Sequence, residues 1–286
     1  MNKATVQFLC NLIPFPRLRK KTRRRLFSQM MDECADRITA EVDANKDILA
    51  RPVKKAPKII WQCWFQGEEQ APELVKRCFE SVKKHHPDYE IRIITDDNMS
   101  DYITFPDYIL KKYKKGKIKR TFFSDLIRVF LLSEYGGVWI DATAYCSERI
   151  PDEILESDFF VLQDPTFPRF LIASWFIVSD ARHPLIEAMK EVLLLYWKEQ
   201  NRTLQYLFFH CLFATVVTKL PAYRELYRKM PFYSDTPPLY LYFYLGKEFD
   251  LHNARNLMEE SFIHKLCHKR KLHGIMELLD DFESRS

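Results

Sequence analysis

The chain has 286 residues, of which 47% are hydrophobic and 14% aromatic, and its formal net charge is +5. This composition excludes a disordered protein, and the length allows one large domain or two small ones. Seven cysteines without a CxxC pair favour reduced thiols in a cytoplasm over a disulfide framework. The longest apolar run, at 207–217, is shorter than the roughly 18 residues that a membrane span needs.

Two basic clusters account for the excess positive charge. The first, at 17–25, follows an apolar stretch at 6–15, which is the reverse of the order in a secretory signal. We interpret it as an amphipathic anchor on the cytoplasmic face of a membrane, where each basic residue adds up to about 1 kcal/mol of attraction. A solvated basic helix or a nucleic-acid arm is the alternative. The second cluster, at 111–120, could receive an anionic substrate or simply form a solvated helix face.

From residue 58 onward, strand-like and helix-like segments alternate. The run 58–64 is β-branched and aromatic and predicts a strand. Apolar residues at helical spacing predict a helix over 72–86, and 89–95 predicts a second strand.

The next predicted helix covers 120–135, where a broad apolar stripe ends at two adjacent glycines, the preferred C-cap residue. A third strand is predicted at 138–143, and two more at 158–164 and 174–180. This alternation predicts an α/β fold with a mostly parallel central sheet flanked by helices. In such sheets, ligands bind beyond the carboxyl ends of the strands.

The remainder of the chain is predicted to be helical over 184–220 and mixed over 221–286, with a Pro- and Tyr-rich loop at 233–246. No internal repeat is evident. We therefore predict an N-terminal basic, amphipathic helical segment at 1–55 and one α/β domain at 56–286.

Three charged residues, Asp125, Arg128 and Asp141, stand in an otherwise hydrophobic passage. Asp125 and Arg128 are three apart on a predicted helix and so share one face, while Asp141 is expected at the end of a strand. Burying a charge is unfavourable unless it is paired. One interpretation is a polar pocket whose carboxylate accepts, and whose guanidinium donates, hydrogen bonds to sugar hydroxyls. The alternative is an ordinary salt bridge on a helix.

Four motifs in order carry a resemblance to a known family: PKIIWQCWFQG (57–67), CFESVKKHHPDYEIRIIT (78–95), SDLIRVFLLSEYGGVWIDAT (124–143) and SFIHKLCHK (261–269). Together they resemble the capsular polysaccharide synthesis protein family, glycosyltransferases related to the DXD-containing, sugar-binding group of glycosyltransferase family 32. The resemblance implies a GT-A-like nucleotide-sugar-binding fold, a nucleotide-sugar donor and retention of anomeric configuration.

The resemblance also implies roles for single residues. Asp125 and Arg128 would hold hydroxyls of the donor sugar and, with Asp141, form the expected catalytic set. Asp141 matches the first acid of the DXD motif, which in relatives lies by the ribose and the metal. Thr143 stands at the third position, where relatives usually have the acid that binds Mn²⁺. A neutral hydroxyl is a weaker ligand for a hard divalent cation than a carboxylate.

The cofactor implied by the resemblance is Mn²⁺ or Mg²⁺, held by Asp141 and His264. Glycosyl transfer expels a diphosphate whose negative charge grows, so a cation must meet it. Lys265 or His264 could serve, since relatives place a C-terminal histidine near the metal and diphosphate. The alternatives for His264, Cys267 and His268 are a plain amphipathic helix or a structural zinc site, which lacks an evident fourth ligand.

Aromatic residues around the first predicted strand suggest a base-binding surface. Trp61 or Trp64 could stack on a uracil ring, with Gln66 and Gly67 in the adjoining loop; core packing is the alternative. Further along the chain, Gln205 stands where relatives tend to have an acid, which could alter acceptor choice or remove a catalytic contact.

The predicted function is transfer of a hexose from a UDP-linked donor to a polysaccharide or lipid-linked glycan acceptor in capsule or surface polysaccharide synthesis. The predicted location is cytoplasmic, peripheral on the inner face of the cell membrane. One alternative is a catalytically silent sugar-binding or scaffold member, suggested by Thr143 and Gln205. The other, a nucleic-acid-binding protein, is disfavoured because no recognised nucleic-acid module accompanies the basic clusters and the pI of about 8.7 is modest.

Overall fold

The computed structural model of the protein describes residues 52–285, apart from 165–171 and 204–206, together with scattered positions between 14 and 50. The helical segment expected at 1–55, with its membrane contact, therefore falls almost entirely outside the described residues. In the described part of the chain, no helix is long and apolar enough to traverse a lipid bilayer.

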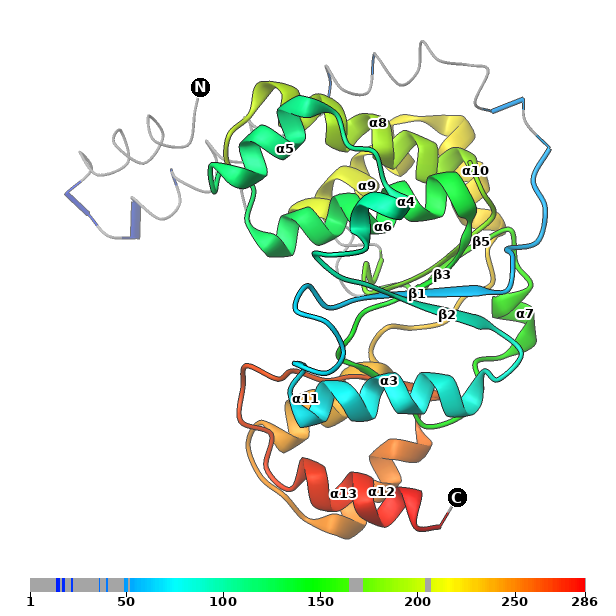
Figure 1. Cartoon of the computed structure of the whole chain (residues 1–286), viewed down its shortest axis with the longest axis vertical. Coiled ribbons are helices and arrows are strands. Elements are labelled where there is room, and N and C mark those ends of the chain that lie inside the picture. Colours follow the sequence, from blue (N-terminus) through cyan, green and yellow to red (C-terminus); the bar gives the residue numbers. More distant parts are fainter. Residues whose placement is uncertain are drawn as a thin grey trace. The chain divides into compact units, whose positions relative to one another are not determined.

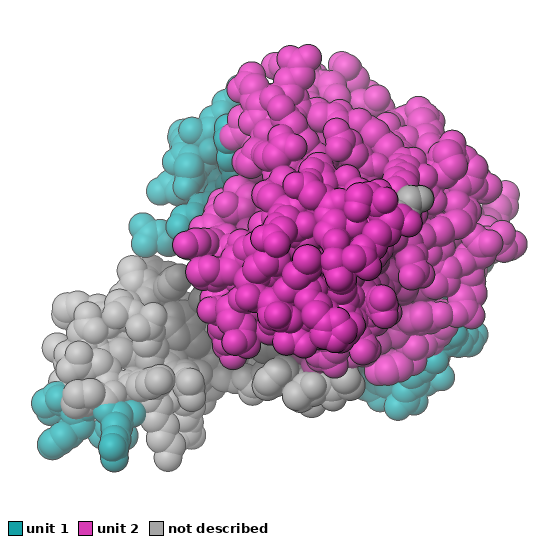
Figure 2. Space-filling model, turned by 90° about the horizontal axis from the view of Figure 1, so that it is seen from below, with its two compact units in different colours: residues 1–51, 105–129, 184–229 teal, residues 52–104, 130–183, 230–286 magenta. Residues whose placement is uncertain are grey.

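The chain divides into two compact units whose segments alternate along the sequence. Unit 1 comprises residues 1–51, 105–129 and 184–229, and unit 2 comprises residues 52–104, 130–183 and 230–286 (Figure 2). The predicted domain boundary at residue 55 stays a prediction. The sheet and most of the predicted site residues belong to unit 2.

A five-stranded sheet forms the centre of unit 2, in the order β2–β1–β3–β6–β5 (Figure 1). β1 pairs in parallel with β2 and β3, whereas β6 runs antiparallel to β3 and β5, so four strands share one direction. This confirms the predicted mostly parallel sheet. The strands are β1 Ile59–Cys63, β2 Glu90–Ile94, β3 Gly137–Ile140, β5 Phe159–Val161 and β6 Phe176–Ser179.

Helices of unit 2 cover both faces of the sheet, as predicted. On one face, Val82 of α3 lies in the same hydrophobic cluster as Ile60 of β1. On the other, Trp61 packs against Tyr102 of α4 and Tyr135 at the end of α6, with ring centroids 5.5 Å apart in each pair. Consecutive residues of β1 thus serve opposite faces. The helices concerned are α3 Glu73–His85, α4 Met99–Tyr102 and α6 Arg120–Tyr135, which begins in unit 1.

The C-terminal part of unit 2 combines a two-stranded antiparallel ribbon with three helices. The helices pack with α3 and Tyr145 of the ribbon in one hydrophobic cluster. These elements are β4 Ala144–Cys146, β7 Ile263–Lys265, α11 Tyr240–Leu245, α12 Leu251–Glu259 and α13 Ile275–Glu283.

The prediction of a loop over 233–246 is wrong for the second half of that segment. A 3₁₀ turn at Pro237–Leu239 leads directly into α11. Leu241 and Leu245 are both fully buried in the C-terminal cluster, and their i, i+4 spacing places them on one helix face. Tertiary burial of this face outweighs the turn-forming tendency of the two prolines.

Unit 1 is helical in its described residues, as predicted for 184–220. In this unit, Tyr113 stacks on Phe123 with ring centroids 3.8 Å apart. The Lys112 ammonium donates to the carbonyl oxygen of Gln200 at 2.8 Å, just beyond the end of α8, so one lysine of the 111–120 cluster caps a helix terminus. The helices are α5 Asp107–Lys114, α8 Pro184–Glu199, α9 Phe208–Lys219 and α10 Pro221–Lys229.

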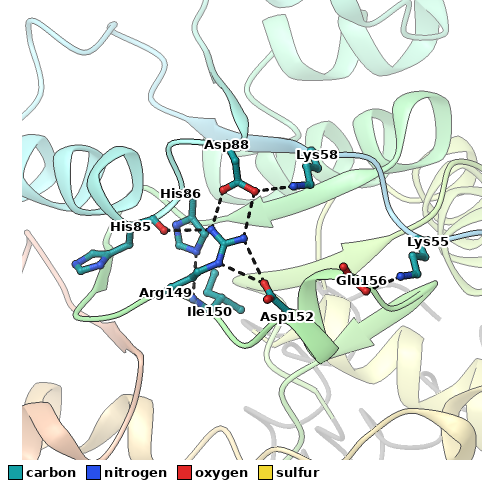
Figure 3. A network of polar contacts seen from close by, with 9 residues as sticks. All are labelled: Lys55, Lys58, His85, His86, Asp88, Arg149, Ile150, Asp152 and Glu156. Carbon is teal, nitrogen blue, oxygen red and sulfur yellow. Dashed lines mark hydrogen bonds and ion pairs between the residues drawn. The ribbon is translucent and has the colours of Figure 1, made fainter.

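A network of charged residues lies where β1 and β2 begin (Figure 3). The Arg149 guanidinium donates to both carboxylate oxygens of Asp88, at 2.7 and 3.2 Å, and to Asp152 of α7 (Asp152–Leu155) at 3.2 Å. Lys58 adds a second cation 2.6 Å from Asp88. Arg149 and Lys58 together hold the pKa of Asp88 well below its usual range. We call these four residues the amino-edge network.

Two glycines turn the chain from α6 into β3. Gly136 (φ +68°) ends the helix as predicted, and Gly137 (φ +103°) begins the strand. A Cβ atom on Gly137 would lie 2.5 Å from the carbonyl oxygen of Ile59 in the neighbouring strand. Only glycine allows the start of β3 to approach β1 this closely.

Candidate functional site

The loops that follow β1 and β3 lie together at one edge of the sheet. The two strands are parallel neighbours, so their carboxyl ends meet at the same edge. Asp141 directly follows β3, as predicted, and Trp64 directly follows β1. Ala142 belongs to the same hydrophobic cluster as the partly buried Trp64, which ties the two loops together.

The Asp141 carboxylate is held by two side chains from distant parts of the sequence. Its Oδ1 accepts a hydrogen bond from the indole of Trp139 at 2.9 Å, and its Oδ2 lies 2.7 Å from the Lys265 ammonium. Its backbone N–H donates to the carbonyl oxygen of Trp175 at 2.9 Å. Asp141 is thus fixed in orientation and paired with a cation.

Strand pairing places Lys265 beside the motif. β7 runs antiparallel to β4, and the N–H of Leu266 donates to the carbonyl oxygen of Thr143 at 2.8 Å. The Lys265 ammonium lies 2.8 Å from the Thr143 hydroxyl and 5.9 Å from the centre of the Trp175 ring. Asp141 and Thr143, the first and third residues of the motif, therefore converge on one lysine. We call Asp141, Thr143 and Lys265 the carboxyl-edge cluster.

His264 does not join this cluster. It precedes Lys265 in a strand, where successive side chains point to opposite faces. Its Nε2 lies 3.0 Å from the hydroxyl of Ser147, which itself donates to the carbonyl oxygen of Ser261. Burial lowers the pKa of His264 to about 4, so the ring is neutral near pH 7. The structure therefore separates His264 from Asp141, its predicted partner in metal binding.

The loop after β1 places a half-buried aromatic beside the cluster. The Trp64 ring meets His268 edge-on, with centroids 5.0 Å apart. The Trp64 indole N–H is buried, and no described residue accepts a hydrogen bond from it. Gly67 (φ +86°) closes the turn by donating to the carbonyl oxygen of Trp64, and Gln66 at its tip is exposed. This loop could contact a ligand through Trp64 and Gln66.

Trp61 is a core residue. Its side chain is 0% exposed, and its indole donates to the carbonyl oxygen of Gly136 at 2.8 Å. The Arg92 guanidinium lies 5.2 Å from the Trp61 ring centre, a cation–π contact. A ring enclosed in this way has no face left for a nucleobase, so the core alternative holds for Trp61, and base stacking by Trp64 stays a prediction.

Asp125 and Arg128 form a buried ion pair in the unit 1 part of α6. The two side chains are 12% and 5% exposed, and the guanidinium lies 3.3 Å from the carboxylate. Arg128 also lies 5.6 Å from the centre of the Phe209 ring. Both charges are therefore buried and paired with each other, and their role toward a ligand stays a prediction.

Comparison with known proteins identifies the family. Residues 16–280 match the family described as "Capsular polysaccharide synthesis protein". The chain belongs to this family. The resemblance found in the four motifs is therefore confirmed.

Curated relatives of this family member are glycosyltransferases by name. Inositol phosphoceramide mannosyltransferase 3 of Schizosaccharomyces pombe is 32% identical over 37% of this chain and 29% of that protein. Mannosyl phosphorylinositol ceramide synthase SUR1 of Saccharomyces cerevisiae is 30% identical over 58% of this chain and 42% of that protein. The chain spans less than half the length of these relatives. The solved structure titled PaToxG Glycosyltransferase matches 70% of this chain and 85% of its own, with a TM-score of 0.43 and 14% identity.

The carboxyl-edge cluster of this family member is a poor fit for Mn²⁺ or Mg²⁺. Such ions prefer about six oxygen ligands, usually one or two carboxylates together with waters and substrate phosphates, and those carboxylates must be available to the ion. The motif supplies one carboxylate and one hydroxyl, and both already bind the Lys265 ammonium. Among the described residues, no three His, Cys, Asp or Glu side chains gather as a metal site, which also leaves the zinc alternative without support.

Two tryptophans of the site were missed by the sequence analysis. The indole of Trp139 fixes Asp141, and its position two residues before that acid was a usable signal, because residues i and i+2 of a strand share a face. The ring of Trp175 lies against Lys265 through the fold alone, and no spacing in the sequence indicates it. Gln205 lies outside the described residues, and its effect stays a prediction.

Proposed function

We propose that the protein is a retaining glycosyltransferase of the GT-A type that transfers a hexose from a nucleotide-sugar donor, most simply UDP-linked, to a polysaccharide or lipid-linked glycan. The family assignment and the named activities of its relatives support glycosyl transfer. The observation that carries the proposal is the carboxyl-edge cluster, where a fixed acid and a fixed cation adjoin an aromatic ring at the sheet edge that binds ligands in α/β folds.

Each side of a nucleotide-sugar has a suitable partner in this arrangement. The half-buried ring of Trp64 offers a face to the base, and the exposed Gln66 can hydrogen-bond to its edge. The Asp141 carboxylate suits ribose hydroxyls, and Lys265 suits the diphosphate. For Asp125 and Arg128, the family resemblance alone supports a role in holding hydroxyls of the donor sugar.

The acceptor and the location are further parts of the proposal. Two of the relatives are named for mannosylating inositol phosphoceramide, a sugar acceptor carried on a lipid. A lipid-linked acceptor fits a protein whose residues 17–25 are mostly basic, since such a cluster is attracted to anionic headgroups. We therefore place the protein on the cytoplasmic face of a membrane, acting in surface polysaccharide synthesis.

A thermal-shift and hydrolysis panel tests the proposal. The full chain is mixed with UDP, GDP, UDP-glucose, UDP-galactose and GDP-mannose, and both the melting temperature and nucleotide release are recorded. We expect at least one nucleotide to raise the melting temperature and its sugar to be hydrolysed slowly. No shift and no release with any compound would refute a donor site.

Variants tested in the same assay distinguish an enzyme from a catalytically silent, sugar-binding member of the family. Thr143 and Gln205, each in place of an acid found in relatives, are the features that favour the silent member. Loss of nucleotide release in both Asp125→Ala and Asp141→Ala, with the melting temperature retained, identifies an enzyme. Donor binding without any release in the wild-type protein identifies a sugar-binding member instead.

A further inference from the structure

Lys265 bonds to the first and third residues of the motif, the two positions that the family resemblance associates with a metal. We propose that its ammonium replaces the divalent cation, so that the protein binds the donor diphosphate and promotes its departure without a metal ion. This inference rests on the proposed function and extends it by naming the group that meets the leaving diphosphate.

The ammonium bonds to both oxygens that a metal at this motif would need. Its Nζ lies 2.7 Å from Asp141 Oδ2 and 2.8 Å from the Thr143 hydroxyl oxygen. A divalent ion bound to the same atoms would stand next to the ammonium, and two cations at that separation repel strongly. Lysine and metal are therefore alternatives at this place.

The remaining oxygen of Asp141 is also engaged. Its Oδ1 accepts the indole N–H of Trp139 at 2.9 Å. A hard cation needs several oxygen ligands, and Thr143 adds only a neutral hydroxyl. Over the described part of the chain, no second acid joins Asp141 within a group of three metal-ligating residues. The site is thus built around a resident ammonium.

Lys265 is held in place before any ligand arrives. Its backbone belongs to β7, and its side chain is 20% exposed beside the 25% exposed Asp141. Among the described residues, its ammonium bonds to Asp141 and Thr143. An ammonium has three N–H donors, so one is left for a phosphate oxygen. The partial exposure gives a ligand access to it.

The chemistry of transfer suits a fixed ammonium. The bond between the sugar C1 and the diphosphate oxygen breaks, and its electron pair stays on the diphosphate. The acceptor hydroxyl oxygen forms the new bond to C1, and its proton passes to a diphosphate oxygen. The growing negative charge is met by a charge-assisted hydrogen bond from Lys265. The donor and the acceptor are the two substrates, and no oxidant or reductant is required.

Paired lysine variants test the inference. Lys265→Met removes the ammonium, and Lys58→Met is the matched control, because the Lys58 ammonium lies 2.6 Å from Asp88 where β1 begins. Nucleotide release from UDP-glucose, UDP-galactose and GDP-mannose is measured with the full chain, in EDTA and in Mn²⁺. We expect EDTA to leave wild-type turnover unchanged, Lys265→Met to lower it about 100- to 1000-fold, and Lys58→Met to leave it unchanged.

A metal-rescue measurement separates a role toward the diphosphate from a purely structural one. Lys265→Ala frees Asp141 and Thr143 to ligate a cation. We therefore expect Mn²⁺ alone to bind more tightly to Lys265→Ala than to the wild type, as followed by the electron paramagnetic resonance signal of free Mn²⁺. We also expect Mn²⁺ to restore part of the turnover of Lys265→Ala.

The outcomes distinguish this inference from the proposed function. Wild-type turnover that disappears in EDTA and returns with Mn²⁺ overturns the metal-free site and leaves the glycosyltransferase intact. Full turnover in Lys265→Met also overturns it. If no donor is hydrolysed, the binding of UDP and GDP is measured in EDTA and in Mn²⁺ instead. Tighter binding in EDTA by the wild type than by Lys265→Met supports the inference. Binding that requires Mn²⁺ overturns it. No binding under either condition refutes the proposed function itself.

Discussion

The amino-edge network and the carboxyl-edge cluster are both built from paired charges, at opposite ends of the strands of one sheet. In the amino-edge network, the Arg149 and Asp88 side chains are 40% and 38% exposed, and two cations balance two acids. In the carboxyl-edge cluster, a single acid and a single lysine are more enclosed and share their bonds with a hydroxyl and an indole.

The difference shows that an ion pair alone does not identify a site. The amino-edge network is satisfied by its own members, and exposed pairs of this kind contribute little to stability. The carboxyl-edge cluster keeps a donor for a ligand and adjoins Trp64, whose buried N–H finds no acceptor among the described residues. Position in the sheet and incomplete bonding distinguish the second group.

The largest expected effect contrasts one acid from each group. Asp141→Asn weakens the hold on Lys265 and removes the charge expected at the ribose, so we predict a fall in donor turnover of about 100- to 1000-fold. Asp88→Asn removes an acid of the amino-edge network and should leave turnover unchanged. Steady-state nucleotide release and circular dichroism of both purified variants provide the test. Equal losses in the two variants would remove the distinction between the edges.

The next effect concerns the strand that positions Asp141. Gly137→Ala would place a methyl group 2.5 Å from the carbonyl oxygen of Ile59, at a backbone angle of +103° that other residues avoid. We predict a loss of unfolding free energy of about 3 kcal/mol, against about 1 kcal/mol for Gly67→Ala, whose added methyl meets nothing within 4 Å. Urea unfolding measures both. A smaller loss for Gly137→Ala than for Gly67→Ala would show that β3 does not need this close approach.

A smaller effect on the free energy of unfolding is expected from a substitution in the middle of β1, between the two edges of the sheet. Gln62 is fully buried, and neither atom of its side-chain amide has a hydrogen-bond partner among the residues that the structure describes. An unsatisfied buried amide is unfavourable, so Gln62→Met should raise the free energy of unfolding by about 1 kcal/mol. Urea unfolding tests this, with nucleotide release as the second measurement. A destabilised variant would mean that the amide has a partner in solution.

The smallest expected effects are the pH-dependent contributions of Asp88 and Asp235 to stability, which have opposite signs. Arg149 and Lys58 lower the pKa of Asp88 below 3.8, so its stabilising contribution is present above pH 3.8 and is lost as the pH falls through the lowered pKa. Burial, and then the Asp164 carboxylate, raise the pKa of Asp235 to about 6, so stability falls as the pH rises from 3.8 toward 6.

At pH 7, Asp88→Asn should therefore lower the melting temperature and Asp235→Asn should raise it. Both differences from the wild type should shrink as the pH is taken below 4. Melting curves across this range provide the measurement. A difference of the same sign for both variants would contradict the environments assigned to the two acids.

Much of unit 2 could be predicted from the sequence because its strands are short, apolar and bounded by turn residues. The runs 58–64, 89–95 and 138–143 each contain one strand of the sheet, and the last correctly placed Asp141 at a strand end. The pairing of Asp125 with Arg128 could be predicted from their spacing, and the structure contains this ion pair. Residues three apart share a helix face wherever the helix lies in the fold.

The choice between His264 and Lys265 could not be made from the sequence. The two residues are adjacent, and the three-residue strand that separates their side chains is too short to show a period. Their faces are set by pairing with β4, more than a hundred positions earlier in the chain. Trp61 was ambiguous for a similar reason, because a tryptophan in so short a strand fits both the core and a ligand-binding surface.

A crystal structure with UDP or GDP bound in the absence of divalent metal tests the central claim most directly. We predict the diphosphate at the carboxyl end of β3, with a phosphate oxygen within about 3 Å of the Lys265 ammonium and the base against Trp64. A nucleotide bound elsewhere on the protein, with Lys265 still enclosed by Asp141 and Thr143 alone, would contradict the account.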